Sequence, residues 1–172
     1  MSVERPVTVA LVSDTHGYLY PEVLEVVARC DRVVHAGDIC GRHILEALHQ
    51  HNENVTAVAG NNDVPERWPE EERDVVISLP RIAELELPGG VVAVEHGHEH
   101  GWASPDLDGL RSAHPHAKMI VYGHTHHRMV DQSQDPWIVN PGAAGKTRNN
   151  GGPSCLVLHA SAEGWEIEAF RF

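Results

Sequence analysis

The sequence is short of positive charge and of long hydrophobic runs, and each shortage excludes a class of protein. Its 172 residues include 13 Lys and Arg against 25 Asp and Glu, a formal net charge of −12 with the histidines neutral. A chain this acidic lacks the basic surface that binds duplex nucleic acid or an anionic membrane. No apolar run approaches the roughly 18 residues that a membrane-spanning helix needs. We therefore expect neither duplex nucleic acid nor a membrane among its partners.

Cysteine is scarce as well. The three cysteines, Cys30, Cys40 and Cys155, are odd in number and form no C-x-x-C pair, which argues against a disulfide framework and favours a reducing compartment. The N-terminal residues contain Glu4 and only a short apolar run, a pattern unlike a signal peptide. No linker or low-complexity tract divides the sequence. We expect a cytoplasmic protein that folds as one domain over residues 1–172.

The sequence does contain a series of short runs rich in Val and Ile, each bounded by turn residues. In the first half, strand-like runs at 7–13, 32–36 and 55–59 alternate with helical patterns at 21–30 and 42–50. Strand–helix–strand alternation of this kind predicts parallel pairing of the strands.

The second half has a different pattern. Residues 83–95 predict a hairpin with a glycine turn, and 104–114 predict a short helix. We interpret the acidic stretch 69–74 as a solvated connection. Together the two halves indicate a mixed α/β protein with two sheets and outer helices. Further strands are predicted at 118–122, 128–132, 137–140, 154–160 and 164–172.

Five of the predicted strands lead directly into a glycine-containing turn with an acid, an amide or a histidine. Each fragment alone is weak evidence, because the chain contains 14 histidines. Ligands of open α/β sheets bind outside the carboxyl ends of the strands, so these five ends would converge on one edge. The glycines let the backbone turn tightly there. The fragments are DTHG with Asp14 and His16, GDICG with Asp38, GNND with Asn61 and Asp63, HGHEHG from His96, and GHTHH with His124 and His126.

The residue types in these fragments predict a metal centre. Carboxylates, imidazoles and an amide oxygen without a thiolate suit divalent Mn, Fe, Ni, Co or Zn. One aspartate can bridge two ions about 3.5–4 Å apart, as two-metal phosphoester hydrolases require. Two such ions would also supply the local positive charge that an anionic substrate needs in an acidic protein.

In this order the five fragments resemble the motifs of the calcineurin-like metallophosphoesterases: D-x-H, G-D, G-N-x-[DE], H-G and G-H-x-H. The chain is similar to the small single-domain prokaryotic phosphodiesterase branch, with its SDTHG start and its GHTH and NPG finish. The resemblance implies a four-layer α/β/β/α fold in which two mixed sheets pack as a sandwich between flanking helices. It also implies hydrolysis of small phosphodiesters by a hydroxide that bridges two divalent ions, with manganese as the first choice of metal.

The resemblance also assigns the ligands. His96 is preferred over His98 because it directly precedes a glycine, as the motif requires, and His98 is the reserve. His127 has no place in the pattern and is expected on the surface. One ion would be held by Asp14, His16, Asp38 and His126, and the other by Asp38, Asn61, His96 and His124, with Asp38 shared.

Three further residues have expected roles near the ligands. Arg148, after the NPG turn at 140–142, would stabilise charge that develops on the phosphorus group. Asp63 would orient neighbouring groups. Asn62 stands where many family members have a histidine that assists the leaving group, which favours substrates with good leaving groups. The expected catalytic set is therefore Asp14, Asp38, Asn61, Asp63 and Arg148.

Two functions other than catalysis predict different features in the sequence. A protein-interaction scaffold, such as the small retromer subunit that resembles this branch, would have an impaired metal site, whereas here all seven ligand positions are filled. A zinc-stabilised regulatory domain would predict a closed four-ligand site. GAAGKT is no phosphate-binding loop, because only two residues separate its glycines. We expect a small-molecule phosphoester as substrate and, from exposed strand edges, a homodimer.

Overall fold

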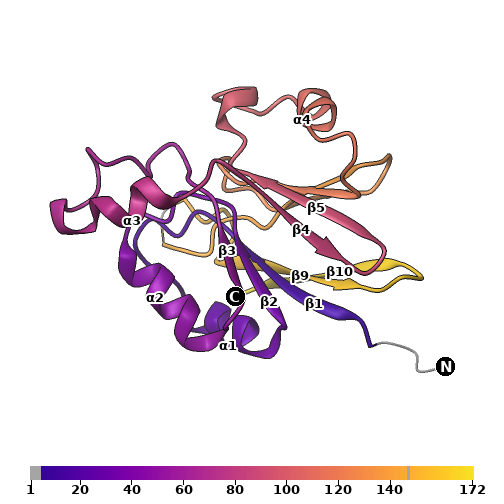
Figure 1. Ribbon diagram of the computed structural model, residues 1–172, viewed down its shortest axis with the longest axis horizontal. Helices are drawn as coiled ribbons and strands as arrows, with labels where there is room; N and C mark the ends of the chain where they lie inside the picture. The colour runs from indigo at the N-terminus through magenta and orange to yellow at the C-terminus, as the bar shows by residue number, and fades with distance from the viewer. Residues whose placement is uncertain (1–4, 147) are drawn as a thin grey trace.

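The computed structural model describes residues 5–146 and 148–172, and two five-stranded sheets dominate it (Figure 1). The first sheet has the order β10-β9-β1-β2-β3. Its strands β1, β2 and β3 are parallel, as the alternation with helices predicts, and β9 is antiparallel to both β1 and β10. The bounds are β1 (Val7–Val12), β2 (Arg32–His35), β3 (Val55–Ala57), β9 (Ser154–Ala160) and β10 (Trp165–Arg171).

The second sheet has the order β4-β5-β6-β8-β7. The predicted glycine hairpin is its antiparallel β4–β5 pair, and β5, β6 and β8 run parallel. Strand β7 closes the far edge as an antiparallel partner of β8. The bounds are β4 (Ile82–Leu87), β5 (Gly90–Glu95), β6 (Met119–Val121), β7 (Met129–Asp131) and β8 (Trp137–Asn140).

Three groups of buried apolar side chains hold the layers together. The central group lies between the sheets and includes Leu11 and Val121. A second group, with Val27 and Leu48, packs α1 (Pro21–Arg29) and α2 (Arg42–His51) on the first sheet, and a third packs α4 (Leu107–Ala113) on the second. The result is the expected α/β/β/α sandwich, with α1 and α2 on one side and α4 on the other (Figure 1).

The prediction for residues 69–74 was wrong in part. These residues are mostly exposed, as expected, but they form η1 (Glu70–Glu72) and the start of α3 (Arg73–Ser78). The short helix escaped prediction because Val75, Val76 and Ile77 are β-branched residues of low helix propensity. Only the middle one of the three is buried. A second unpredicted turn of 3₁₀ helix, η2 (His98–His100), follows β5.

The cysteines and the helices agree with the composition of the sequence. All three cysteines are free, and all three lie in the described residues. Within the described ranges, the helices are too short or too polar for any of them to cross a membrane.

Candidate metal centre

The loops after the central strands of both sheets meet at one edge of the sandwich. The loops after β1 and β2 are held together by backbone hydrogen bonds, from Asp14 N–H to the Gly37 carbonyl and from His16 N–H to the Asp38 carbonyl, both 3.0 Å. The loop after β6 joins them, because His124 N–H donates to Asp14 Oδ2 at 3.1 Å. The polar side chains that follow each strand are thereby brought into one cluster.

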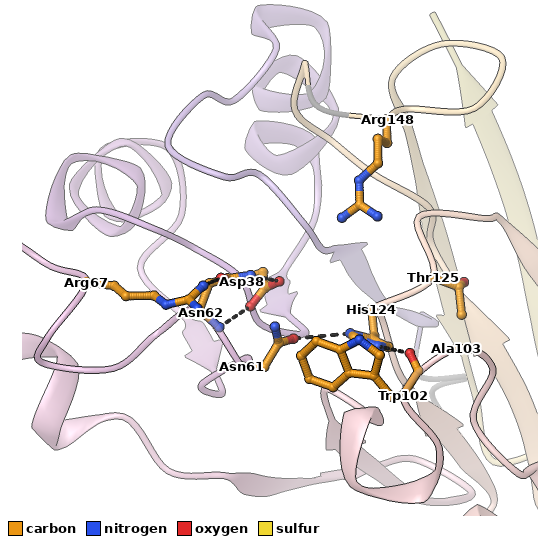
Figure 2. A pocket seen from close by; sticks show the side chains of 9 residues that line it. All are labelled: Asp38, Asn61, Asn62, Arg67, Trp102, Ala103, His124, Thr125 and Arg148. Carbon is orange, nitrogen blue, oxygen red and sulfur yellow. Dashed lines mark hydrogen bonds between the residues drawn. The ribbon is translucent and has the colours of Figure 1, made fainter.

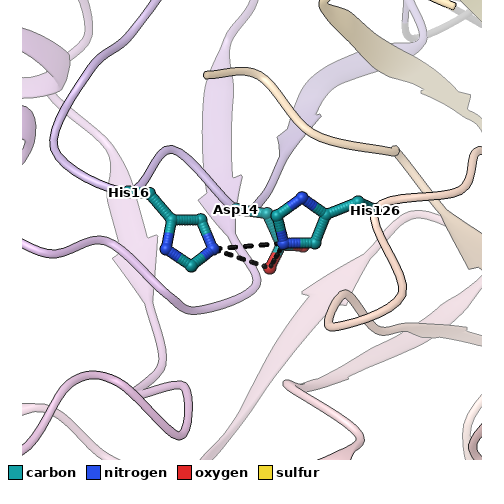
Figure 3. A group of neighbouring side chains, drawn as sticks. All are labelled: Asp14, His16 and His126. Carbon is teal, nitrogen blue, oxygen red and sulfur yellow. Dashed lines mark hydrogen bonds and ion pairs between the residues drawn. The ribbon is translucent and has the colours of Figure 1, made fainter. Parts of the chain in front are cut away.

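Three of these side chains point at a common centre (Figure 3). Asp14 Oδ1 lies 3.4 Å from His126 Nε2 and 3.9 Å from His16 Nε2, and the two imidazole nitrogens are 3.1 Å apart. Ligand atoms about 2.0–2.2 Å from one ion are separated by roughly 3–3.6 Å at ordinary coordination angles. Two of the three separations lie in this range and the third, 3.9 Å, is slightly longer, so the three atoms surround a space of about the size that one ion needs.

Asp38 lies between this group and the next. Its Oδ2 is 3.5 Å from His16 Nε2 and 3.4 Å from His96 Nε2. Asp14 Oδ1 is also 3.9 Å from His96 Nε2, so Asp14 belongs to both groups. One carboxylate within reach of imidazoles on either side is the arrangement that a shared ligand needs.

Asn61 and His124 lie next to the second group. Asn61 Oδ1 is 3.1 Å from His124 Nδ1, and the His96 and His124 rings lie 5.3 Å apart between centroids. Figure 2 shows both side chains on the wall of a cavity that Asp38 also lines. The seven side chains selected from the sequence thus lie in one continuous cluster at the sheet edge.

Backbone carbonyls orient two of the histidines. His96 donates from Nδ1 to the Ala36 carbonyl at 2.8 Å, and His124 donates from Nε2 to the Trp102 carbonyl at 2.5 Å. A carbonyl only accepts, so the outer nitrogen of each ring carries a proton. The inner nitrogens, His96 Nε2 and His124 Nδ1, face the cluster, which is how proteins usually prepare histidine ligands for a metal.

The backbone at this edge is strained. Among the described residues, seven that are not glycine have a positive φ between 45° and 70°. Non-glycine residues rarely adopt this conformation, which costs about 1–3 kcal/mol each and concentrates at functional sites. Five of the seven belong to the predicted ligand set, and two others lie beside it. They are Asp14, His16, Asp38, His124 and His126, with Cys40 and Arg148.

At two of the motif glycines a side chain would clash with neighbouring atoms, although the backbone there needs no positive φ. A Cβ on Gly60 would lie 2.2 Å from Asp38 Oδ1, and one on Gly123 would lie 2.1 Å from Ser13 Oγ and 2.7 Å from Asp14 Oδ2. Neither glycine has a positive φ. The prediction that glycine serves a tight turn holds for Gly37 and Gly97, at φ 100° and 97°. At Gly60 and Gly123 the absent side chain leaves room for a carboxylate.

Two atoms in the cluster are buried without any hydrogen-bond partner, Asp14 Oδ1 and His96 Nε2. Burial raises the pKa of Asp14 to about 7. Burial also works against charge on His96, but the nearby carboxylates, with Asp38 Oδ2 3.4 Å from its Nε2 and Asp14 Oδ1 at 3.9 Å, outweigh it and raise the pKa of His96 to about 9. Burial raises the pKa of Asp38, but His96 and the hydrogen bonds from Asn62 outweigh it and hold that pKa below its usual range. Burying such groups without partners costs free energy that a bound cation would recover.

Asp63 fixes the two loops without facing the cavity. Its carboxylate accepts backbone N–H bonds from Ile39 at 3.1 Å, Cys40 at 2.9 Å and Gly60 at 2.8 Å. These bonds tie the loop of Asp38 to the loop of Asn61. Its burial raises the pKa of Asp63, and the three donors oppose that rise. Asp63 therefore holds the two loops together, and its expected role near the ligands stays a prediction.

Asn62, which lines the cavity, donates two hydrogen bonds to Asp38. Its backbone N–H and side-chain amide donate to the two oxygens of the Asp38 carboxylate, each at 2.8 Å. Its own carbonyl accepts a hydrogen bond from the Arg67 guanidinium. Both ends of the side-chain amide are thus engaged, and Asn62 holds the Asp38 carboxylate in its orientation.

The cavity above the cluster has a volume of about 390 Å³. Arg148, from the loop after β8, places Nη2 3.3 Å from His126 Nε2, and Arg67 approaches from the loop after β3 (Figure 2). Trp102 also lines the cavity. Sequence reasoning missed Arg67 and Trp102, because neither belongs to a motif and only the folded loops bring them to the ligands.

The remaining histidines near the motifs have other surroundings. His127 is exposed, as expected. His35 is fully buried, where its Nε2 is 2.9 Å from Thr15 Oγ1, which confirms the prediction of a packed, hydrogen-bonded residue. The ring of His98 lies 5.5 Å from that of His96 between centroids. Its buried Nδ1 has no hydrogen-bond partner. Asn140 donates to the Gly123 carbonyl at 2.9 Å and braces the loop of His124.

Comparison with known proteins fits this geometry. The family model of the calcineurin-like phosphoesterase superfamily domain matches residues 7–163. The chain belongs to this superfamily. It is 24% identical to phosphodiesterase MJ0936 of Methanocaldococcus jannaschii over 144 residues, which cover 78% of this chain and 82% of that protein. It is 26% identical to a probable metallophosphoesterase of Methanothermobacter thermautotrophicus, covering 95% and 91% of the two chains.

A solved structure of the same fold gives a spatial comparison for this superfamily member. Wild-type Vps29 of Entamoeba histolytica, crystallised in complex with Zn²⁺, superposes with a TM-score of 0.75 at 17% identity, over 96% of this chain and 98% of that one. At this identity the likeness establishes the shared fold alone.

Proposed function

We propose that this protein is a divalent-metal-dependent phosphodiesterase that hydrolyses small phosphodiesters, with residues 1–172 acting as one catalytic domain. The observation that carries the proposal is the convergence of two carboxylates, an amide and four histidines on one strained sheet edge. The unpartnered atoms Asp14 Oδ1 and His96 Nε2 face that cluster. The 24% identity to a phosphodiesterase supports the reaction class.

The donor set fits a pair of divalent ions. Asp14, His16, Asp38 and His126 would hold one ion, and Asp38, Asn61, His96 and His124 would hold the other. These oxygen and nitrogen donors suit manganese, our first choice, and also nickel, iron, cobalt or zinc. When bound, such ions supply Lewis-acid activation of water and of the phosphoryl oxygens.

The cationic side chains of the cavity would bind the substrate phosphate. Arg148 and Arg67 enter from different loops and place two guanidinium groups in a protein of net charge −12. Guanidinium forks donate paired hydrogen bonds to phosphoryl oxygens and stabilise the charge that develops there.

The leaving group would receive little help from protein acids. The Asn62 amide has no acidic proton at neutral pH, and its hydrogen bonds to Asp38 and Arg67 engage both of its ends. We therefore propose that good substrates carry a leaving group that departs without protonation.

The alternative function is a protein-interaction scaffold. The likeness to Vps29 concerns the fold alone and does not favour this alternative over catalysis. The intact cluster favours the enzyme, because a scaffold has no need for the strain and the unpartnered buried atoms found here. The homodimer expected from the sequence stays a prediction.

The decisive experiment separates metal from protein. Purified protein would be stripped with a chelator, reloaded separately with Mn, Ni, Fe, Co or Zn, and assayed on bis(4-nitrophenyl) phosphate. We expect hydrolysis with at least one ion, none in the stripped protein, and slower release of nitrophenol from the monoester 4-nitrophenyl phosphate. Protein that binds metal by elemental analysis but hydrolyses the diester with none of the five ions would overturn the enzyme proposal.

A further inference from the structure

Trp102 is an exposed aromatic residue on the wall of the cavity (Figure 2). Its exposed fraction is 68%, although tryptophan is usually largely buried. Among the described residues, the other large hydrophobic side chains with high exposure lie outside this cavity. An indole left in solvent beside a polar site indicates a contact that the protein alone does not make.

The loop holds Trp102 in place despite this exposure. Its carbonyl accepts the 2.5 Å hydrogen bond from His124 Nε2, and a 2.8 Å bond from Asp106 N–H to the His100 carbonyl closes the base of the loop. Gly101, at φ 141°, allows the tight turn, since a Cβ there would lie 2.5 Å from the Ser104 carbonyl oxygen. The backbone is anchored to a candidate ligand while the indole stays free.

The indole does not stack on its neighbour. Its centroid is 5.2 Å from that of His124, and the two ring planes meet at 65°. In this edge arrangement the imidazole does not cover both faces of the indole. A flat face therefore remains available for a planar group.

The other residues of the cavity indicate where the phosphate that carries this planar group would bind. Arg67 and Arg148 supply positive charge for a phosphate, and Asp38 of the cluster lines the same cavity. At about 390 Å³ the cavity is within the size range of small-molecule sites. A phosphate between the arginines and the cluster would leave its organic group to reach the indole.

We propose that Trp102 is a stacking platform for a planar aromatic group of the substrate, so that the preferred class is phosphodiesters that carry a nucleobase or an aryl ring. This inference rests on the proposed function, because it assigns the organic group of the same substrate. Stacking on an aromatic side chain tightens the binding of a base by about tenfold or more. It is tolerant of base identity, because every base offers a flat face.

The test measures binding and not hydrolysis. Calorimetry would compare adenosine 5′-monophosphate with ribose 5-phosphate, which keeps the phosphate and loses the base, on the metal-loaded protein. We expect the nucleotide to bind about tenfold more tightly, Trp102→Ala to abolish the difference, and Trp102→Phe to keep most of it. Ile77→Ala is the matched control, because Ile77 is 69% exposed and lies outside the cavity.

The ratio of the two affinities within each variant cancels any general loss of folded protein. Equal affinities in the unsubstituted protein, or an unchanged ratio in Trp102→Ala, would overturn the inference. If Trp102→Ala instead altered sedimentation and left the ratio unchanged, the indole would be a protein contact and the inference would fail. Absence of hydrolysis with a normal ratio would count against the enzyme proposal and not against the platform.

Discussion

Each end of the first sheet has an aspartate, and the two differ in how completely their carboxylate oxygens are hydrogen-bonded. At the amino end, Asp31 before β2 accepts two bonds from Arg5 at 3.0 and 2.7 Å, and Thr8 donates to it from N–H at 2.9 Å and from Oγ1 at 3.0 Å. These bonds, the one from Arg5 above all, lower the pKa of Asp31 to about 2. At the carboxyl end of the same strands, Asp14 is fully buried and has one carboxylate oxygen that accepts no hydrogen bond.

The difference separates stability from function within one sheet. The amino end satisfies its charge with its own residues, so it gains stability from them. The carboxyl end carries strained φ angles and unmatched buried groups, which lower stability in the protein alone. Sites prepared for a ligand commonly cost stability in this way. The cost is recovered when the ligand binds.

The largest test of the comparison is Asp38→Asn. Removing the shared carboxylate should lower kcat for a chromogenic diester by about a thousandfold or more, because the electrostatic stabilisation at the centre is lost. His127→Ala, at an exposed histidine that directly follows the G-H-x-H motif, should stay within about twofold of the unsubstituted protein. Comparable losses in the two variants would show that the ligand assignment is wrong.

A smaller effect is expected at Arg148. Arg148→Ala should lower kcat/KM by about ten- to a hundredfold, the equivalent of one or two charge-assisted hydrogen bonds to the phosphate. Arg42→Ala is a suitable control, since Arg42 forms an exposed pair with Glu46 and lies outside the cavity. Steady-state kinetics on both variants would decide, and an Arg148 variant with normal kcat/KM would remove this residue from the phosphate site.

At Asp14 the comparison predicts that Asp14→Asn does not lower the melting temperature without metal at pH 8 but lowers it relative to the unsubstituted protein when metal is added. Because the folded pKa of about 7 exceeds the ordinary 3.8, metal-free stability should fall as pH rises from about 4 to about 7. Asp14→Asn should flatten this slope and melt at least as high as the unsubstituted protein at pH 8 without metal. Added metal should then stabilise the unsubstituted protein and not the variant. Differential scanning fluorimetry with and without chelator measures both, and a lower metal-free melting temperature in the variant would contradict the comparison.

The smallest effect is expected at the amino end. The depressed pKa of Asp31 contributes stability that is present above about pH 4 and is lost as pH falls towards 2. Asp31→Asn should therefore lower the melting temperature by a few degrees at pH 6, with or without metal, and by less near pH 3. A difference that stays constant from pH 6 to pH 3 would show that the ion pair is not its source.

The parallel pairing of β1, β2 and β3, the β4–β5 hairpin and the position of the site could be predicted from the sequence, because all of them depend on local patterns. Runs such as 7–13 and 118–122 lead into a glycine-containing turn with metal-capable residues, and the carboxyl ends of parallel strands necessarily share an edge. The helix at 73–78 escaped because its β-branched residues favour strand, and burial of Val76 outweighed that preference.

The environment of the ligands could not be predicted in the same way. Nothing in the motif shows that Asn62 would hold both oxygens of Asp38, or that Arg67 would in turn hold Asn62. These contacts depend on the exact path of the loop after β3. The open face of Trp102 is likewise a property of a folded loop, since a tryptophan in a sequence is expected to be buried.

The crowded glycines limit how this protein can diverge among its descendants. An added methyl group would lie 2.2 Å from Asp38 Oδ1 at Gly60, and 2.1 Å from Ser13 Oγ and 2.7 Å from Asp14 Oδ2 at Gly123, so even alanine at either position would force these side chains to move. Gly164, which has no heavy atom within 4 Å of an added Cβ, carries no such restriction. A descendant that no longer needed the Asp14 and Asp38 carboxylates in these positions would be released from this constraint, and a side chain at Gly60 would record the change.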